Sequence, residues 1–200
     1  LQDVFLRCET GRVTGLLGRN GCGKTSLMNL IMGELKAEQQ YNALDGMAIL
    51  GHHRDPADIA YLPQYHFIPT GLRTEKVLKD YDIAFATLCS DFPEFDNKFG
   101  TRVRDLSGGE RRLLEVYIVL MSKSHFVLLD EPFSQLMPKN ISRIKELIKR
   151  QKTHKGILVS DHMFREISDI SDDLYVITNG RTIQVSSPQE LISLGYTRVL

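Results

Sequence analysis

The stretch Gly18-Arg19-Asn20-Gly21-Cys22-Gly23-Lys24-Thr25 decides the fold, because four free positions separate a glycine from a Gly-Lys-Thr ending. The apolar residues 13–17 precede it as a strand, and residues 26–32 have the pattern of a helix. A strand, a glycine-rich loop and a helix in this order are the setting of a phosphate-binding loop. Glycines let backbone N–H groups converge on one anion, and the helix N-terminus attracts negative charge. We therefore expect this loop to bind a nucleotide.

Two side chains at the end of the loop complement its backbone groups. Lys24 is expected to reach the outer phosphates, and the Thr25 hydroxyl is expected to ligate Mg²⁺. Cys22 is interpreted as a small loop residue, because a redox role requires a lowered thiol pKa. The nucleotide-binding residues predicted from this stretch are Gly18, Asn20, Gly21, Cys22, Gly23, Lys24, Thr25 and Ser26.

The composition fits a single globular domain over residues 1–200. The 25 basic side chains balance 25 acidic ones, so charge gives no reason to expect a nucleic-acid partner. No apolar run approaches the roughly 20 residues that span a bilayer, so work at a membrane would require another chain. The three cysteines are scattered without metal-ligand spacing, which is typical of reduced thiols.

Short apolar runs alternate with helical patterns along the chain, which predicts an open, mostly parallel α/β sheet flanked by helices. Residues 36–51 indicate a small antiparallel β subdomain. Residues 65–107 are expected to form a helical subdomain, with helical spacing of apolar residues between 71 and 98. Strands are predicted at 1–7, 13–17, 59–62, 126–129 and 157–160, and a helix at 141–152.

The end of the chain carries two local signals. Asn179-Gly180 between residues 174–178 and 181–186 predicts a tight β-hairpin. Ser187-Pro188-Gln189-Glu190 has the pattern of a capping box, which predicts a short helix to about residue 194.

Acidic and imidazole side chains follow two of the predicted strands. Asp130 and Glu131 come directly after residues 126–129, and His162 follows residues 157–160. Ligands of parallel α/β sheets bind at the carboxyl ends of the strands, where the glycine loop also lies. Asp130 is the expected second contact to Mg²⁺, through water. Glu131 can orient or deprotonate the water that attacks the γ-phosphate. Taken without the glycine loop, the two acids leave open the alternative that they are ordinary strand-end residues.

Ser107-Gly108-Gly109-Glu110 opens another predicted helix. An exposed helix N-terminus with small residues resembles a second anion site. The apolar face of this helix carries Leu113, Val116, Tyr117, Leu120 and Met121.

With these motifs in place, nearly the whole chain closely resembles the nucleotide-binding subunits of ATP-binding-cassette (ABC) transporters. Leu106-Ser107-Gly108-Gly109-Glu110 is similar to the signature motif of that family, with Glu where Gln is commonest. Pro63-Gln64 resembles the Q-loop, Asp130-Glu131-Pro132 the Walker B end, and His162 the switch histidine, all in the family's order. Residues 106–112 and 161–166 are most similar to the ATPases of lipopolysaccharide export and of branched-chain amino-acid import.

The resemblance implies a P-loop NTPase that hydrolyses ATP with Mg²⁺ as cofactor. The implied catalytic residues are Glu131, His162 and Lys24: the glutamate would act on the attacking water, and the histidine would touch the γ-phosphate. Thr25, Gln64 and Asp130 are the implied Mg²⁺ contacts. The other histidines, His66 among them, are interpreted as solvated or structural.

The resemblance also implies partners. A second copy of the chain, or a homologous ATPase, would sandwich two ATP molecules head to tail. Each ATP would lie against Ser107, Gly108, Gly109 and Glu110 of the opposite chain. Gln64 would relay closure to an integral membrane transporter subunit. That subunit would hold the protein in the cytoplasm at the inner face of the membrane.

Two departures from the family pattern leave alternatives open. Met137 stands where the loop after Walker B usually has Asp, and Met cannot accept hydrogen bonds as Asp does. The aromatic residue on which the family stacks adenine lies upstream of Leu1, so we expect the N-terminus to be incomplete. The competing functions are a soluble, non-transport ABC ATPase and a regulatory ABC module with impaired turnover.

Overall fold

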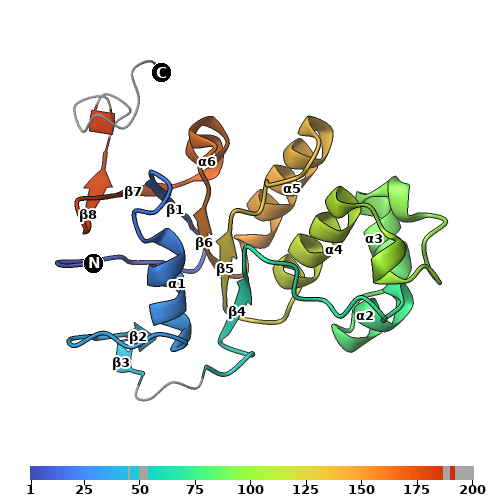
Figure 1. The fold of residues 1–200 in the computed structure, drawn as a ribbon, viewed down its shortest axis with the longest axis horizontal. Coiled ribbons are helices and arrows are strands. Elements are labelled where there is room, and N and C mark those ends of the chain that lie inside the picture. Colours follow the sequence, from blue (N-terminus) through green and yellow to red (C-terminus); the bar gives the residue numbers. More distant parts are fainter. Residues whose placement is uncertain (45, 50–53, 187–189, 192–200) are drawn as a thin grey trace.

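A six-stranded sheet forms the centre of the computed structural model, which describes residues 1–44, 46–49, 54–186 and 190–191 (Figure 1). The strand order is β4-β5-β6-β1-β7-β8. All neighbouring strands are parallel except β7 and β8, which are antiparallel. The mostly parallel α/β sheet predicted from the sequence is therefore confirmed. The strands are β1 (Val13–Gly18), β4 (Ile59–Leu62), β5 (Phe126–Asp130), β6 (Gly156–Ser160), β7 (Asp173–Thr178) and β8 (Arg181–Val185).

Helices cover both faces of this sheet, so its inner strands are buried on both sides. The first face packs Leu16 and Leu128 against α1, whereas the second packs Leu17 and Leu129 against α4 and α5. Neighbouring residues of a strand point to opposite faces, which divides the core into these two clusters. The helices are α1 (Lys24–Met32), α2 (Thr74–Asp80), α3 (Phe85–Asp91), α4 (Gly108–Leu120), α5 (Pro138–Gln151) and α6 (Phe164–Ile170).

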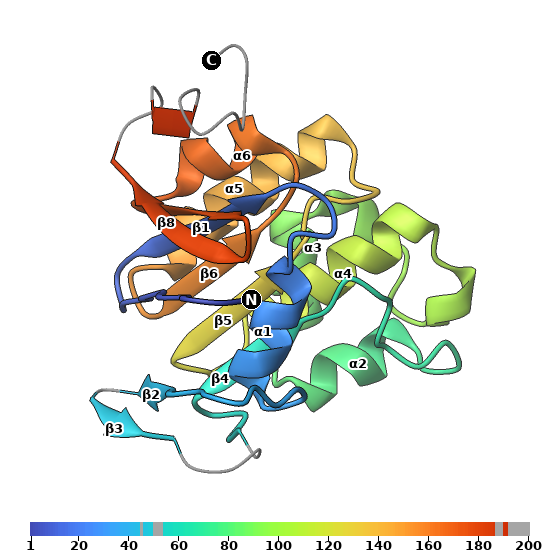
Figure 2. The same ribbon diagram turned by 60° about the vertical axis from the view of Figure 1, so that its left-hand side comes forward.

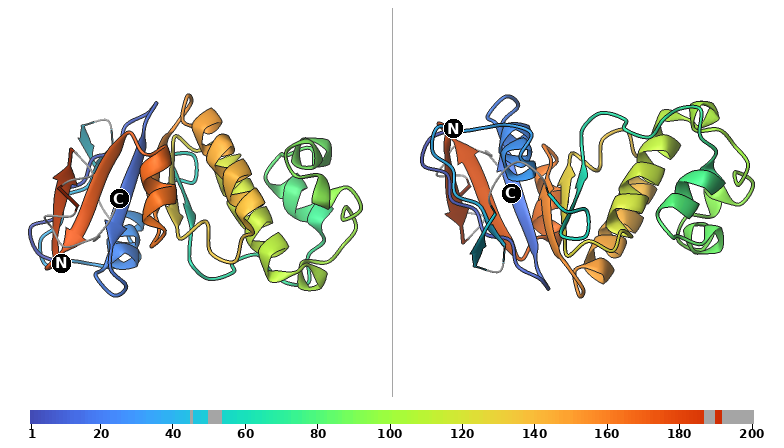
Figure 3. Two further views of the ribbon diagram at one scale, coloured as in Figure 1. Left: turned by 90° about the horizontal axis from the view of Figure 1, so that it is seen from above. Right: turned by 90° about the horizontal axis from the view of Figure 1, so that it is seen from below.

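The helices α2 and α3 lie at the end of the molecule opposite β7 and β8 (Figure 3). The helical pattern predicted for residues 71–98 divides into these two helices at a turn in which Asp82 has a φ of 57°. Pro93 then begins the 3₁₀ turn η1 (Pro93–Phe95), and η2 (Val103–Asp105) leads to α4. No helix in the described part of the chain is long and apolar enough to cross a membrane.

The predicted small antiparallel sheet is confirmed as β2 (Ala43–Leu44) paired with β3 (Met47–Ala48), beside the C-terminal end of α1 (Figure 2). The predicted hairpin at Asn179-Gly180 is confirmed as β7 and β8. Residues 187–189 of the predicted capping box and most of the helix predicted after it lie outside the described residues.

The predicted strand at residues 1–7 is wrong. The Gln2 N–H donates to the Gly180 carbonyl at 2.7 Å, but no ladder follows. The Thr182 hydroxyl accepts from the Phe5 N–H at 2.8 Å and donates to the Phe5 carbonyl at 2.6 Å. A side chain therefore takes the two bonds that a partner backbone would make in a sheet.

Candidate nucleotide-binding site

The glycine loop is wound tightly between β1 and α1. Gly21 and Gly23 have φ values of 77° and 109°, in the left-handed region that favours glycine. The Lys24 ammonium is buried and donates to the Gly18 carbonyl at 2.9 Å. The Cys22 sulfur lies 2.3 Å from where a Cβ on Gly18 would be, so a side chain at residue 18 would have to displace that sulfur. Cys22 thus packs inside the loop, as a small loop residue is expected to do.

A hydroxyl and a carboxylate meet beside this loop. The Thr25 Oγ1 atom donates to Asp130 Oδ2 at 2.6 Å, and the Ser160 hydroxyl donates to Asp130 Oδ1. Asp130 is fully buried at the end of β5, where it pairs in register with Ser160 of β6. Hydroxyl and carboxylate oxygens are the ligands that Mg²⁺ prefers, so these side chains fit that ion.

The loop lines a cavity of about 340 Å³. Gln64 from the end of β4 and Glu131 from the end of β5 reach the same cavity, as expected for residues at the carboxyl ends of parallel strands. Its lining residues are Asn20, Gly21, Gly23, Lys24, Thr25, Ser26, Gln64 and Glu131.

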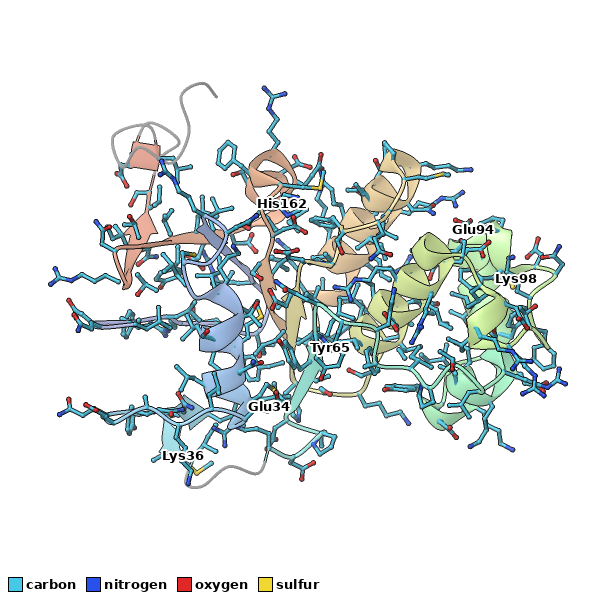
Figure 4. The ribbon with its side chains drawn as sticks, viewed as in Figure 1. Glu34, Lys36, Tyr65, Glu94, Lys98 and His162 are labelled. Carbon is cyan, nitrogen blue, oxygen red and sulfur yellow. The ribbon has the colours of Figure 1, made fainter. Side chains whose placement is uncertain are left out.

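Glu131 and His162 lie side by side at the ends of β5 and β6 (Figure 4 labels His162). The His162 Nδ1 atom is 3.9 Å from Glu131 Oε2 and 3.2 Å from Asp161 Oδ1. Asp161 is fully buried and accepts the N–H groups of Phe133 at 3.3 Å and Met163 at 3.0 Å. Burial raises the pKa of the Asp161 carboxyl. Asp161 thus ties the segment after Glu131 to the segment that carries His162.

The residues Ser107–Glu110 form the first turn of α4 and its cap, and they are absent from the lining of the cavity. The Ser107 hydroxyl accepts the Glu110 N–H at 3.3 Å, and Glu110 Oε2 accepts the Ser107 N–H at 2.9 Å. This reciprocal pair is a capping box. Ser107 and Gly108 are exposed. The contact to ATP from a second chain stays a prediction.

Three residues around the site were not predicted from the sequence. Ser160 and Asp161 are polar residues at the end of a buried strand, the same signal that identified Asp130. Arg112 is 1% exposed on α4 and donates to backbone carbonyls at the ends of β4 and β5. Its signal is an arginine among the apolar residues of the inward face of the helix.

A parallel α/β sheet, a glycine loop before α1 and the Thr25–Asp130 pair define a P-loop nucleotide-binding domain. More specifically, the chain belongs to the ABC transporter family, because the family model with that description matches residues 1–134. The resemblance seen in the motifs is thereby confirmed.

Curated relatives agree with this assignment. The chain is 33% identical to a probable ABC transporter ATP-binding protein of Azorhizobium caulinodans, covering 96% of this chain and 74% of the relative. It is 31% identical to the lipopolysaccharide export system ATP-binding protein LptB of Haemophilus influenzae, covering 96% and 86%.

Solved structures share the fold. An ATP-binding subunit of an ABC transporter superposes with a TM-score of 0.81 at 20% identity, over 98% of this chain and 87% of the other. An archaeal ribosome recycling factor, in its complex with a ribosomal stalk protein, matches with a TM-score of 0.76 at 22% identity. This second match covers 94% of this chain and 38% of the other.

Proposed function

We propose that this chain is the ATP-hydrolysing subunit of an ABC transporter and that two copies close head to tail around ATP to power transport. The observation that carries the proposal is the single cavity that contains Lys24, Thr25, Gln64 and Glu131, with Asp130 bonded directly to Thr25. The 31% identity to a lipopolysaccharide export ATPase supports transport as the process served.

The hydrolysis step follows from these side chains. The loop N–H groups and Lys24 bind the phosphates, and Thr25, Asp130 and Gln64 would hold Mg²⁺, which neutralises phosphate charge when bound. Glu131 accepts a proton from the attacking water as its oxygen bonds to the γ-phosphorus. The bond from that phosphorus to the β–γ bridging oxygen breaks, and ADP leaves. His162, oriented by Asp161, contacts the γ-phosphate.

The second chain completes the site with the exposed N-terminus of α4. Ser107 and Gly108 are accessible there, and the positive end of a helix dipole favours a phosphate.

The alternative function, a regulatory ABC module with impaired turnover, is kept for one specific reason. Met137 is 74% exposed in the loop expected to bridge the two chains, and it has no carboxylate.

The proposal is tested by light scattering of the Glu131→Gln variant with and without Mg-ATP. Removal of the carboxylate should slow hydrolysis strongly, so ATP should convert a monomer into a stable dimer. The matched control adds Lys24→Ala, which weakens phosphate binding and should leave the protein monomeric. A wild-type chain that hydrolyses no ATP would refute the enzymatic proposal. A Glu131→Gln variant that stays monomeric with ATP would favour the regulatory alternative.

The membrane partner is proposed to dock on the groove that follows Gln64. This groove has a volume of about 600 Å³, and its lining includes Tyr61, Tyr65, Phe67 and Tyr81. Tyr65 is 68% exposed and directly follows Gln64, so docking would act one residue away from the cavity (Figure 4). Residues 65–107 are the proposed helical subdomain, which contributes Tyr65, Phe67 and residues 80–82 to this groove. Docking would hold the chain at the cytoplasmic face of the membrane.

Replacement of Tyr65 by alanine tests the docking surface. We expect the variant to lose co-purification with the membrane subunit and to keep its basal ATPase activity. Tyr41→Ala is the matched control, because Tyr41 is 75% exposed and does not line the groove. Equal co-purification of the two variants would show that the docking site lies elsewhere.

A further inference from the structure

Arg112 is a charged side chain in the middle of the molecule. It lies in the second turn of α4, is 1% exposed, and shares its face of the helix with Leu113 and Val116, which are fully buried. A buried charge is costly unless hydrogen bonds replace its lost hydration. The partners of the guanidinium therefore indicate what the arginine does.

Three backbone carbonyls accept from this guanidinium. Its Nη1 atom donates to Pro63 at 2.8 Å, and its Nη2 atom donates to Asp130 at 2.7 Å and to Glu131 at 2.9 Å. The last paired residues of β4 and β5 are Leu62 and Leu129, so these carbonyls lie just beyond the ladder. Arg112 thus joins the two strand ends at the point where the strands stop bonding to each other.

The bonds of Arg112 flank the backbone of the proposed catalytic glutamate. Glu131 has a φ of 50°, a left-handed conformation that residues other than glycine rarely adopt. Such a conformation persists where the surroundings hold it in place. The Asp130 and Glu131 carbonyls lie on either side of the Glu131 Cα atom, so holding both restricts its two backbone rotations. The bond to the Pro63 carbonyl holds the peptide unit that directly precedes Gln64.

Glu115 supplies the counter-charge and anchors the arrangement. Its side chain is fully buried, and its Oε2 atom lies 3.8 Å from Arg112 Nη1. His66 Nδ1 contacts the same oxygen at 2.8 Å, and Arg111 Nε lies 3.4 Å from Oε1. His66 belongs to the segment after Gln64. The histidine interpreted as solvated or structural therefore fastens this segment to α4.

We propose that Arg112 is a positioning residue for ATP hydrolysis, which holds Glu131 and Gln64 together at the cavity through their backbones. The inference rests on the proposed function, because it assigns Arg112 a part in that reaction. It differs from a folding role in one respect: nucleotide binding by the glycine loop does not depend on Arg112, whereas the placement of Glu131 does.

The test compares Arg112→Lys and Arg112→Met with a matched control, Lys155→Met. Lysine keeps the charge but has its donors on a single nitrogen, which cannot span from Pro63 to Glu131 as a guanidinium does. Lys155 is a second buried cation that bonds backbone carbonyls: it is 4% exposed, donates to the Leu120 and Ser122 carbonyls at 2.8 and 2.6 Å, and does not line the cavity. The measurements are kcat, KM for Mg-ATP, nucleotide affinity by fluorescence, and the thermal unfolding midpoint.

We expect Arg112→Lys to lower kcat at least fivefold, with KM and nucleotide affinity within threefold of wild type, and Arg112→Met to lower kcat further. Lys155→Met should lose thermal stability but keep kcat within twofold. In single-turnover measurements, Arg112→Lys should change the residual rate of Glu131→Gln by a smaller factor than it changes the wild-type rate, because the part of its effect that acts through the Glu131 carboxylate is then absent.

Two results would overturn the proposal. The first is a kcat for Arg112→Lys within twofold of wild type. The second is loss of nucleotide binding in Arg112→Lys, which would assign Arg112 to folding. If Arg112→Met does not fold, Arg112→Lys decides alone. A wild-type chain that binds ATP without hydrolysing it would instead refute the proposed function, so the two failures are distinguishable.

Discussion

Two adjacent glycines at the start of α4 should respond oppositely to the same substitution. A Cβ added at Gly108 would lie 2.9 Å from the side-chain Oε1 atom of Gln135. A Cβ added at Gly109 would lie 2.9 Å from the backbone oxygen of the same Gln135. Both distances are too short for a stable contact. The first obstacle is the end of an exposed, flexible side chain, whereas the second is main chain.

The magnitudes follow from this difference. Alanine is favoured over glycine in a helix by about 0.5–1 kcal/mol. In Gly108→Ala, the Gln135 side chain can rotate away, so the variant should be neutral or up to about 1 kcal/mol more stable. In Gly109→Ala, the backbone of residue 135 must move. Strain of this kind typically costs about 1–3 kcal/mol, which leaves a net loss of about 1 kcal/mol.

Urea unfolding of both variants, in the wild-type background and with Gln135→Ala, measures these effects. Truncation of Gln135 removes the Oε1 atom but leaves the backbone oxygen. The change in unfolding free energy caused by Gly108→Ala should therefore be more favourable in the Gln135→Ala background than in wild type. The loss caused by Gly109→Ala should be the same in both backgrounds. The reasoning is refuted if Gly109→Ala is as stable as Gly108→Ala, or if adding Gln135→Ala recovers the stability lost in Gly109→Ala.

Two further perturbations test the buried polar groups. Burial lowers the pKa of Lys155 from 10.5 to about 8, and a neutral amine can still donate to the Leu120 and Ser122 carbonyls. Between these two pKa values the native state binds fewer protons than the unfolded state, so stability rises with pH. The difference in unfolding free energy between wild type and Lys155→Met should therefore increase by roughly 1–2 kcal/mol from pH 8 to 9.5. An unchanged difference in urea unfolding would contradict this shift. Asp130→Asn should lower kcat at least about 100-fold, since the carboxylate at Thr25 is lost. Equal Mg²⁺ dependence of nucleotide binding in wild type and Asp130→Asn would contradict the metal assignment.

The sheet could be predicted from the sequence where strands are buried on both faces. Residues 59–62 were predicted as a strand, and β4 has these same limits. The predicted 126–129 and 157–160 each differ from β5 and β6 by one residue. Continuous apolar runs of four or five residues fit such strands, and polar residues mark their ends. The hairpin was predictable for another local reason, since Asn179 and Gly180 both adopt the positive φ that its turn requires.

Residues 1–7 mislead because partial alternation describes a side-chain pattern and not a pairing partner. Their partners on the hairpin are the Gly180 carbonyl, which accepts from Gln2, and the Thr182 hydroxyl, which lies 177 positions away from Phe5. A local pattern carries no information about such a contact. The division of residues 71–98 into α2 and α3 was not predicted, for a similar reason. Val77 of α2 and Leu88 of α3 are both buried in the same core, so their spacing stays helical across the turn at Asp82.

The sequence predicts that Gln64 and Glu131 lie near the glycine loop, because all three follow the carboxyl ends of parallel strands. It does not predict which side chains hold Gln64 and Glu131 in place. Asp161 and Arg112 act through backbone atoms of segments that are distant in the sequence. Parallel strands that separate at a ligand site leave carbonyls without ladder partners, and these carbonyls must find donors nearby. A helix packed over the strand ends can supply the donors only from its buried face. An arginine in an otherwise apolar helical face, downstream of a glycine loop, therefore indicates a guanidinium that donates to carbonyls at the strand ends. Arg112, with Glu115 three residues later, is an example.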